Sequence, residues 1–289
     1  MQTYRKFEQT LTDALAGMSE GDIIPMSEAK LRFAEHRSMR GFVFSPSGGT
    51  LLTDESGNEK LAKGEGWKLV MLALAPHSAS GVADLCSQST PSCRDNCVAF
   101  AGNGGFPKVL AARQARVDFL AEHPREFVSL LVHTLDRLTR KADLAVRLNG
   151  FSDIRWERVL PAWFWERFAD VKFYDYTKHS VSSRPVSTMP ANYSLTYSVT
   201  ERSTPQGVAR ERAAGRSVAV VVNRRGGKHA TRDHLHPLPF ADHLVDGDVN
   251  DRRFDDPPGS VVGLRRKGSL MPDHPLVVHD DRLAQLIGV

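Results

Sequence analysis

The stretch WKLVMLALAPHSASGVADLCSQSTPSCRDNC, residues 67–97, joins an apolar run of strand length to a polar loop that holds all three cysteines of the chain. The cysteines are Cys86, Cys93 and Cys97, and a glycine-rich segment follows them. A helical pattern begins after that segment. The stretch therefore predicts a buried strand, a loop and a helix, and loops in this position carry the chemistry of α/β proteins.

Three interpretations of the cysteines are open. Buried cysteines would behave as small hydrophobic side chains, but the segments between them, SQSTPS and RDN, are polar and turn-forming. A disulfide would leave one thiol over, and nothing in the sequence indicates an oxidising compartment. A metal site uses all three thiolates, and it is the interpretation that we favour.

The spacing of the cysteines also bears on the choice of metal. Structural zinc sites commonly contain two CxxC pairs, and this spacing lacks them. We therefore expect an iron–sulfur cluster in preference to zinc, with one iron left without a cysteine ligand. Zinc is the alternative, and His77 of the same loop is its candidate fourth ligand.

Length and composition indicate an ordinary globular protein. Of the 289 residues, 41% are hydrophobic and 25% are charged. We find no apolar run long enough to span a membrane, and the N-terminus lacks the apolar centre of a signal peptide. We therefore expect a cytoplasmic protein without a membrane partner. The net charge of +4 is compatible with an anionic ligand or a nucleic acid and demands neither.

Seven apolar segments, each followed by polar residues, recur along the chain. They centre near residues 70, 146, 173, 196, 220, 245 and 262. Helical patterns begin at Pro107 and Pro124, where proline suits the first helical turn, and around Gln206. Strands that alternate with helices predict an α/β protein with a parallel sheet. Seven such units favour a full or partial parallel (β/α) barrel over an open sheet.

The chain then divides into two parts. We expect residues 1–66 to form an N-terminal extension, helical and then hairpin-like, that packs on the core, because so few residues seldom fold alone. Residues 67–289 would form the barrel-like α/β domain, with the cysteine loop at 76–105. In such a barrel the C-terminal strand ends surround one site.

Polar groups at these strand ends would bind a polar ligand with amine, carboxylate and hydroxyl groups. Lys178 follows the strand near residue 173, beside Asp175 and Tyr176. A lysine at the mouth of a barrel can bind phosphate or carboxylate, or act as a base where it is desolvated. The alternative for each of these residues is a strand end that simply reaches solvent.

Several motifs resemble a known phage family. They are NGFSDIRWE, FYDYTK, ANYSLTYS and VDGDVNDRRFDDPPGSVVGLRRKG, together with the spaced cysteines followed by AGNG. These segments look like the actinobacteriophage family called gene product eighty-eight, over roughly residues 67–270. The resemblance implies a phage origin and a location in the cytoplasm of an infected bacterium. It implies no particular chemistry.

A second resemblance concerns the architecture. A cysteine triplet after the first strand of a parallel barrel is similar to that of the radical S-adenosylmethionine (SAM) enzymes. In that superfamily three cysteines hold a [4Fe-4S] cluster, and the open iron binds the amino and carboxylate groups of SAM. The gaps around Cys93 are longer than in the usual CxxxCxxC pattern, and Asn96 stands where that pattern has an aromatic residue.

Our first hypothesis is a radical-SAM-like iron–sulfur enzyme that acts on a nucleotide or another polar substrate. The expected metal ligands are Cys86, Cys93 and Cys97, the expected cofactor contacts are Asn149, Ser152, Asp153 and Ser198, and the catalytic candidates are Asp175, Tyr176 and Lys178. The sequence leaves the substrate, the reaction and the oligomeric state open.

The second hypothesis is a non-enzymatic protein stabilised by zinc. It would target a host protein or a nucleic acid through basic loops around Arg224, Arg225, Arg265 and Arg266. Colour separates the two hypotheses, because an iron–sulfur cluster absorbs visible light and a zinc site does not.

Overall fold

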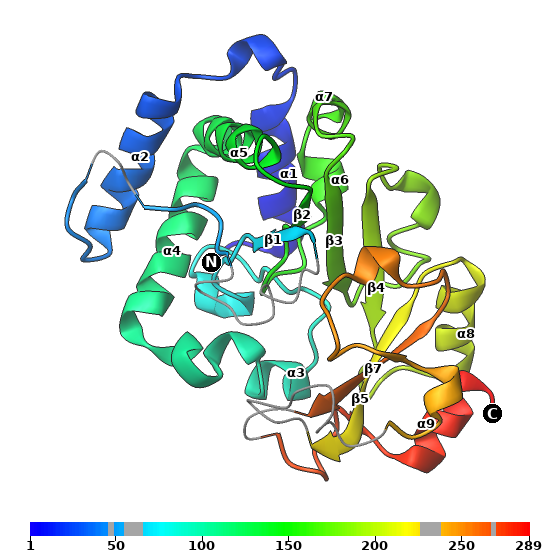
Figure 1. Ribbon diagram of the computed structural model, residues 1–289. Coiled ribbons are helices and arrows are strands. Elements are labelled where there is room, and N and C mark those ends of the chain that lie inside the picture. Colours follow the sequence, from blue (N-terminus) through cyan, green and yellow to red (C-terminus); the bar gives the residue numbers. More distant parts are fainter. Residues whose placement is uncertain (46–48, 55–65, 226–237, 267–269) are drawn as a thin grey trace.

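A single parallel sheet forms the centre of the computed structural model, which describes residues 1–45, 49–54, 66–225, 238–266 and 270–289. Its strands follow the order β1-β2-β3-β4-β5-β7-β6, and β8 pairs beside β5. The path curls into a half-barrel (Figure 1), and no pairing joins its end strands β1 and β6 among the described residues. The sequence-based expectation of a partial parallel barrel is therefore confirmed.

All seven strands expected from the sequence are present. The strands are β1 (Lys68–Met71), β2 (Leu144–Arg147), β3 (Lys172–Thr177), β4 (Tyr193–Ser198), β5 (Val218–Arg225), β6 (Val245–Asp246), β7 (Val261–Arg266) and β8 (Val277–Val278). The two-residue β8 was not expected, since two apolar residues are too few to mark a strand in sequence. The order of the last strands also departs from chain order, because β7 lies between β5 and β6.

The helices begin where the sequence provides a start signal. They are α1 (Tyr4–Leu15), α2 (Met26–Met39), α3 (Pro91–Asp95), α4 (Pro107–Glu122), α5 (Pro124–Thr139), α6 (Trp156–Val159), α7 (Ala162–Arg167), α8 (Pro205–Ala213) and α9 (Asp280–Ile287). Proline opens α4 and α5 as expected. The aromatic helical stretch after β2 is divided into α6 and α7, because Leu160 precedes Pro161 and is extended.

The N-terminal helices complete the core on one side of the half-barrel. Helix α2 lies along α4 and α5, and α1 contacts α5 and α6 (Figure 1). Phe7, Leu11 and Phe33 are buried in the same apolar cluster as Phe127 and Val146. Part of the expected hairpin, residues 46–48 and 55–65, lies outside the described residues.

A second apolar cluster fills the other end of the sheet. Val208 of α8, Val220 of β5 and Leu283 of α9 are buried in it. Helix α9 was not among the expected elements, although its two aspartates in the first turn are a recognised start signal. No helix in the described part of the chain is both long and apolar enough to cross a membrane.

Candidate metal centre

The cysteine loop lies against the segments that follow β2 and β4. The Cys86 thiol donates to the main-chain oxygen of Phe151, which follows β2, at 3.4 Å. The Thr90 hydroxyl donates to the Glu201 carboxylate, which follows β4, at 3.0 Å. The loop therefore lies at the C-terminal edge of the sheet, where parallel α/β folds place their sites.

The loop is anchored further by α3, the short helix that carries Cys93. Thr90 is the N-cap of α3, and its hydroxyl oxygen accepts a hydrogen bond from the Cys93 N–H at 3.2 Å. At the other end of α3, the Asn96 amide contacts His274 at 2.6 Å. The helix is thus tied to the end of β4 and to the segment that precedes β8.

The ammonium group of Lys178, directly after β3, interacts with all three cysteines. Burial lowers the pKa of this half-buried lysine. Three neighbours, Cys93, Asp153 and Cys86, raise it by more, so the net shift of the pKa is upward. Cys93 also accepts a hydrogen bond from the lysine. Lys178 in turn lowers the pKa of Cys97. Three thiols and one carboxylate therefore all interact with the Lys178 ammonium at the end of β3.

Two main-chain N–H groups are directed at the sulfur atoms. Burial raises the pKa of the Cys86 thiol to about 12, and the N–H of His77 offsets part of that rise. Burial also raises the pKa of Cys97, and the N–H of Ala99 offsets part of it. Hydrogen bonds of this kind favour the thiolate form, and they tune the sulfur ligands of iron–sulfur clusters.

The separation of the sulfur atoms can be compared with the ligand spacing of a zinc ion. The three Sγ atoms do not all lie within 4.8 Å of one another. A tetrahedral zinc ion with bonds of about 2.3 Å holds its sulfur ligands about 3.8 Å apart. A cluster separates its thiolates more widely, because iron and sulfide atoms lie between them. The thiols as they stand are therefore not assembled around one zinc ion.

His77 adds a nitrogen donor to the same loop. Its φ of 36° is rare for a residue other than glycine, and its Nε2 is buried without a hydrogen-bond partner in the described residues. Burial and the charge of Arg94 lower its pKa, opposed by Asp84, so the imidazole is neutral at pH 7. A neutral imidazole is the form that binds metals.

The expected cofactor contacts after β2 are largely engaged within the fold. Asn149 is buried, and its Oδ1 accepts from the Ser152 hydroxyl at 2.9 Å. Its Nδ2 donates to Asp175 at 3.1 Å. The next residue, Gly150, lies so close to the end of β1 that a Cβ there would stand 2.8 Å from the oxygen of Leu72, which follows that strand. These contacts hold the loop in place and leave the Asn149 amide little freedom to bind a ligand.

Asp153 links the cysteine loop to β3. Its N–H donates to the oxygen of Leu85 at 2.8 Å, and its carboxylate accepts from the main-chain N–H of Lys178 at 2.8 Å. The same carboxylate pairs with the buried Arg184 at 3.4 Å, and Arg184 also pairs with Glu157 at 2.6 Å. Sequence analysis did not single out Arg184, because a lone arginine in a polar loop belongs to no motif.

The catalytic candidates separate in space. Asp175 is fully buried and accepts a hydrogen bond from the Tyr193 hydroxyl at 2.7 Å. The Tyr176 ring stacks against the guanidinium of Arg147 at 5.1 Å, and its buried hydroxyl has no partner among the described residues. Of the three candidates, Lys178 is the one that the structure brings to the cysteines.

Ser198 lies one strand further along. It is half-buried at the end of β4, and the contact found for it is its main-chain pairing with Ala219 of β5. The structure therefore gives it a place at the same edge of the sheet without joining it to the thiols.

Two of the basic residues considered for nucleic-acid binding form ion pairs within the protein. Arg265 is buried and pairs with Asp246 at 2.7 Å and Asp248 at 3.3 Å. Arg224 pairs with Asp280 at 2.8 Å. Arg266 donates to the oxygen of Leu270 at 3.3 Å, and the Arg225 side chain lies outside the described part of the chain.

Comparison with known protein families gives a match. The family model described as Gene product 88 matches residues 50–283, which include the three cysteines, the loop after β2 and Lys178. No curated protein and no solved structure matches the chain.

Proposed function

The chain belongs to the phage gene product 88 family, and we propose that its three cysteines hold a [4Fe-4S] cluster at the mouth of the half-barrel. The observation that supports the proposal is that Lys178, at the C-terminal strand ends, interacts electrostatically with Cys86, Cys93 and Cys97. None of the three cysteines forms a disulfide, and free cysteine thiolates are the usual ligands of such clusters.

The charges around the thiols support a cluster. Three thiolates bring negative charge into a partly buried site, and uncompensated charge there is costly. Lys178 supplies one nearby cation. Arg113 of α4, which donates to the oxygen of Gly104 at 3.2 Å, supplies another beside Cys97. The N–H groups of His77 and Ala99 add donors to the sulfur atoms.

We further propose a radical-SAM-like enzyme that acts on a nucleotide or another polar substrate. The cluster, when bound, would supply one electron and an open iron for the amino and carboxylate groups of SAM. Lys178 would then hold an anionic group of the ligand, because its ammonium is a compact point charge. Asp153 fixes the main chain of Lys178.

The first experiment measures metal and sulfide in protein purified without oxygen, together with its absorption spectrum. Wild-type protein should contain iron and sulfide in near-equal amounts and absorb visible light, and the Cys93→Ala variant should lose both. A Ser87→Ala variant, changed in the same loop, should keep them. Zinc alone, lost in Cys93→Ala, would favour the zinc-stabilised binding protein, and metal-free wild-type protein would remove both hypotheses.

The enzymatic part needs a separate measurement. Cluster-loaded protein should cleave SAM under reducing conditions, and the Lys178→Met variant should do so more slowly while keeping its iron. Iron and sulfide without SAM cleavage would leave a cluster-binding protein and end the radical-SAM proposal.

A further inference from the structure

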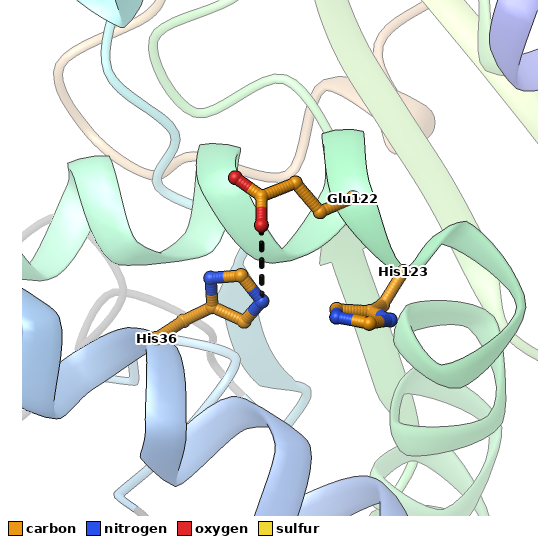
Figure 2. Close-up of side chains that lie close together, drawn as sticks. All are labelled: His36, Glu122 and His123. Atoms are coloured by element: carbon orange, nitrogen blue, oxygen red, sulfur yellow. Dashed lines mark ion pairs between the residues drawn. The ribbon is translucent and has the colours of Figure 1, made fainter.

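A second set of metal-type donors lies where α2 meets the junction of α4 and α5. His36 belongs to α2, Glu122 ends α4, and His123 connects α4 to α5. One ligand atom of each residue lies within 4.8 Å of those of the other two. Figure 2 shows the two imidazole rings and the carboxylate turned toward one another. No sequence motif indicates this group, because His36 lies on α2 and His123 lies far along the chain, in the connection between α4 and α5.

Local packing holds the first histidine in place. The His36 ring lies 5.7 Å from that of Phe119 on α4, and Phe119 lies 5.3 Å from Phe33, one turn before His36. His36 is only 2% exposed, whereas the side chain of Glu122 is 62% exposed. The group therefore has a fixed imidazole on its inner side and a solvent-facing carboxylate through which an ion can arrive.

The hydrogen bonding of His36 is incomplete. Its Nε2 lies 4.0 Å from the Glu122 carboxylate, too far for a hydrogen bond. Its Nδ1 is buried without a partner in the described part of the chain. A buried polar atom without a partner is uncommon and costs free energy. Burial lowers the pKa of His36, and His123 lowers it further. The carboxylates of Glu122, Asp118 and Glu35 oppose this effect without reversing it. The ring is therefore in its neutral form, which is the form that binds metals.

The second histidine, His123, faces a carboxylate with one of its two ring nitrogens. His123 Nδ1 lies 3.6 Å from Glu126 Oε1, one turn into α5. This arrangement leaves Nε2 as the nitrogen available to an ion. Histidines that bind metals commonly face a carboxylate with their other nitrogen, which fixes the ring and increases its basicity.

We propose that His36, Glu122 and His123 form a zinc-type divalent metal site that joins α2 to the α4–α5 junction. Two imidazoles and one carboxylate are a ligand set that suits zinc, and three protein ligands leave the fourth position to water. The ion would fasten the N-terminal helices to the half-barrel. This site contains none of the cysteines, so its existence does not depend on the proposed cluster.

Cobalt titration of the intact protein tests the site, because cobalt reports its ligands through its spectrum. Co²⁺ bound to nitrogen and oxygen should give visible bands without the near-ultraviolet band of cobalt–thiolate bonds, and Zn²⁺ should displace it. The Glu122→Gln variant should weaken binding by about tenfold or more, and Glu126→Gln by about tenfold. The exposed His243→Ala variant is the matched control and should bind as the wild type does.

The site also predicts a stability effect that needs no spectrum. Zn²⁺ should raise the unfolding temperature of the wild type, because an ion that binds only the folded state stabilises it, and it should raise that of Glu122→Gln much less. Glu122 is exposed, so this variant keeps the fold even where His36→Ala does not. Unchanged cobalt affinity in both Glu122→Gln and His123→Asn would overturn the proposal. Cobalt binding that disappears in Cys93→Ala would do the same, because the ion would then belong to the cysteine loop.

Discussion

Asp175 has a protonation state that depends on the fold. It lies in β3 with no exposed surface, and burial raises its pKa from 3.8 to about 6 although the bonds from Tyr193 and Asn149 lower it. Between these two values the folded chain keeps a proton that the unfolded chain has lost. Stability from this group is therefore fully present below about pH 4 and falls as the pH rises to about 6. The difference of about two pH units corresponds to about 3 kcal/mol.

Replacing Asp175 by asparagine should remove this pH dependence. Relative to the variant, the wild type should lose about 3 kcal/mol of unfolding free energy between pH 4 and pH 7. Urea denaturation across that range measures the difference, and the exposed Asp170→Asn variant is the control. The variant also carries a constant cost, because its amide meets the Asn149 amide, but that cost does not vary with pH. A difference that stays flat from pH 4 to pH 7 would contradict the assignment.

Lys178 should set the pH at which the thiols bind metal. Burial raises the pKa of Cys86 and Cys97, and the charge of Lys178 offsets part of that rise. These thiols must lose protons before they bind a metal. In the Lys178→Met variant, the pH at which half of the protein is loaded with iron and sulfide should rise by roughly one unit. Lys172→Met, at the exposed start of the same strand, should load as the wild type does. Loading curves that coincide would show that the lysine charge does not reach the sulfur atoms.

Among the elements, α3 is too short to be stable without its cap. The Thr90 hydroxyl accepts from the Cys93 N–H and donates to Glu201, so one side chain closes the helix and fastens it to the end of β4. Thr90→Val should cost about 1 kcal/mol of stability, as the loss of an N-cap does. It should also lower the iron content of purified protein, because the helix that presents Cys93 would fray.

A matched cap separates these two effects. Thr204 caps α8 in the same way, accepting from the Gly207 N–H at 3.1 Å, and it lies outside the cysteine loop. Thr204→Val should lower the unfolding free energy by a similar amount, about 1 kcal/mol, and leave the iron content unchanged. Equal iron loss in both variants would assign the effect to general destabilisation.

Elements with strong local signals could be predicted from the sequence, and contacts between distant elements could not. The strands of the half-barrel are apolar runs that end in polar residues, and proline marks the starts of α4 and α5. The last helix, α9, was missed although Leu283, Leu286 and Ile287 have helical spacing. The cysteines were recognised as a group, but their contact with Lys178 depends on how β1 and β3 are placed in the sheet. His36 and His123 come together only because α2 packs on α4 and α5.

At the scale of the whole molecule, the N-terminal helices are part of the central core. The family model begins at residue 50, yet Leu11 of α1 is 0% exposed within the cluster that also contains Trp156. The Tyr4 hydroxyl further accepts from the Arg155 N–H at 3.1 Å, in the loop that follows β2. The half-barrel and α1 should therefore unfold together.

Leu11→Ala tests that coupling. It should lower the unfolding free energy by about 3 kcal/mol, the range for a leucine removed from a packed core, and do so in one transition. Leu31→Ala on α2, where the leucine is 40% exposed, is the control and should change it by less than about 1 kcal/mol. Circular dichroism follows all helices, and tryptophan fluorescence follows the half-barrel core around Trp156. Coincident curves mean that α1 and the core form one cooperative unit, because the same event then removes both signals. If helix were lost first and fluorescence later, the N-terminal helices would be a separate layer, and a metal ion at His36 would stabilise that layer alone.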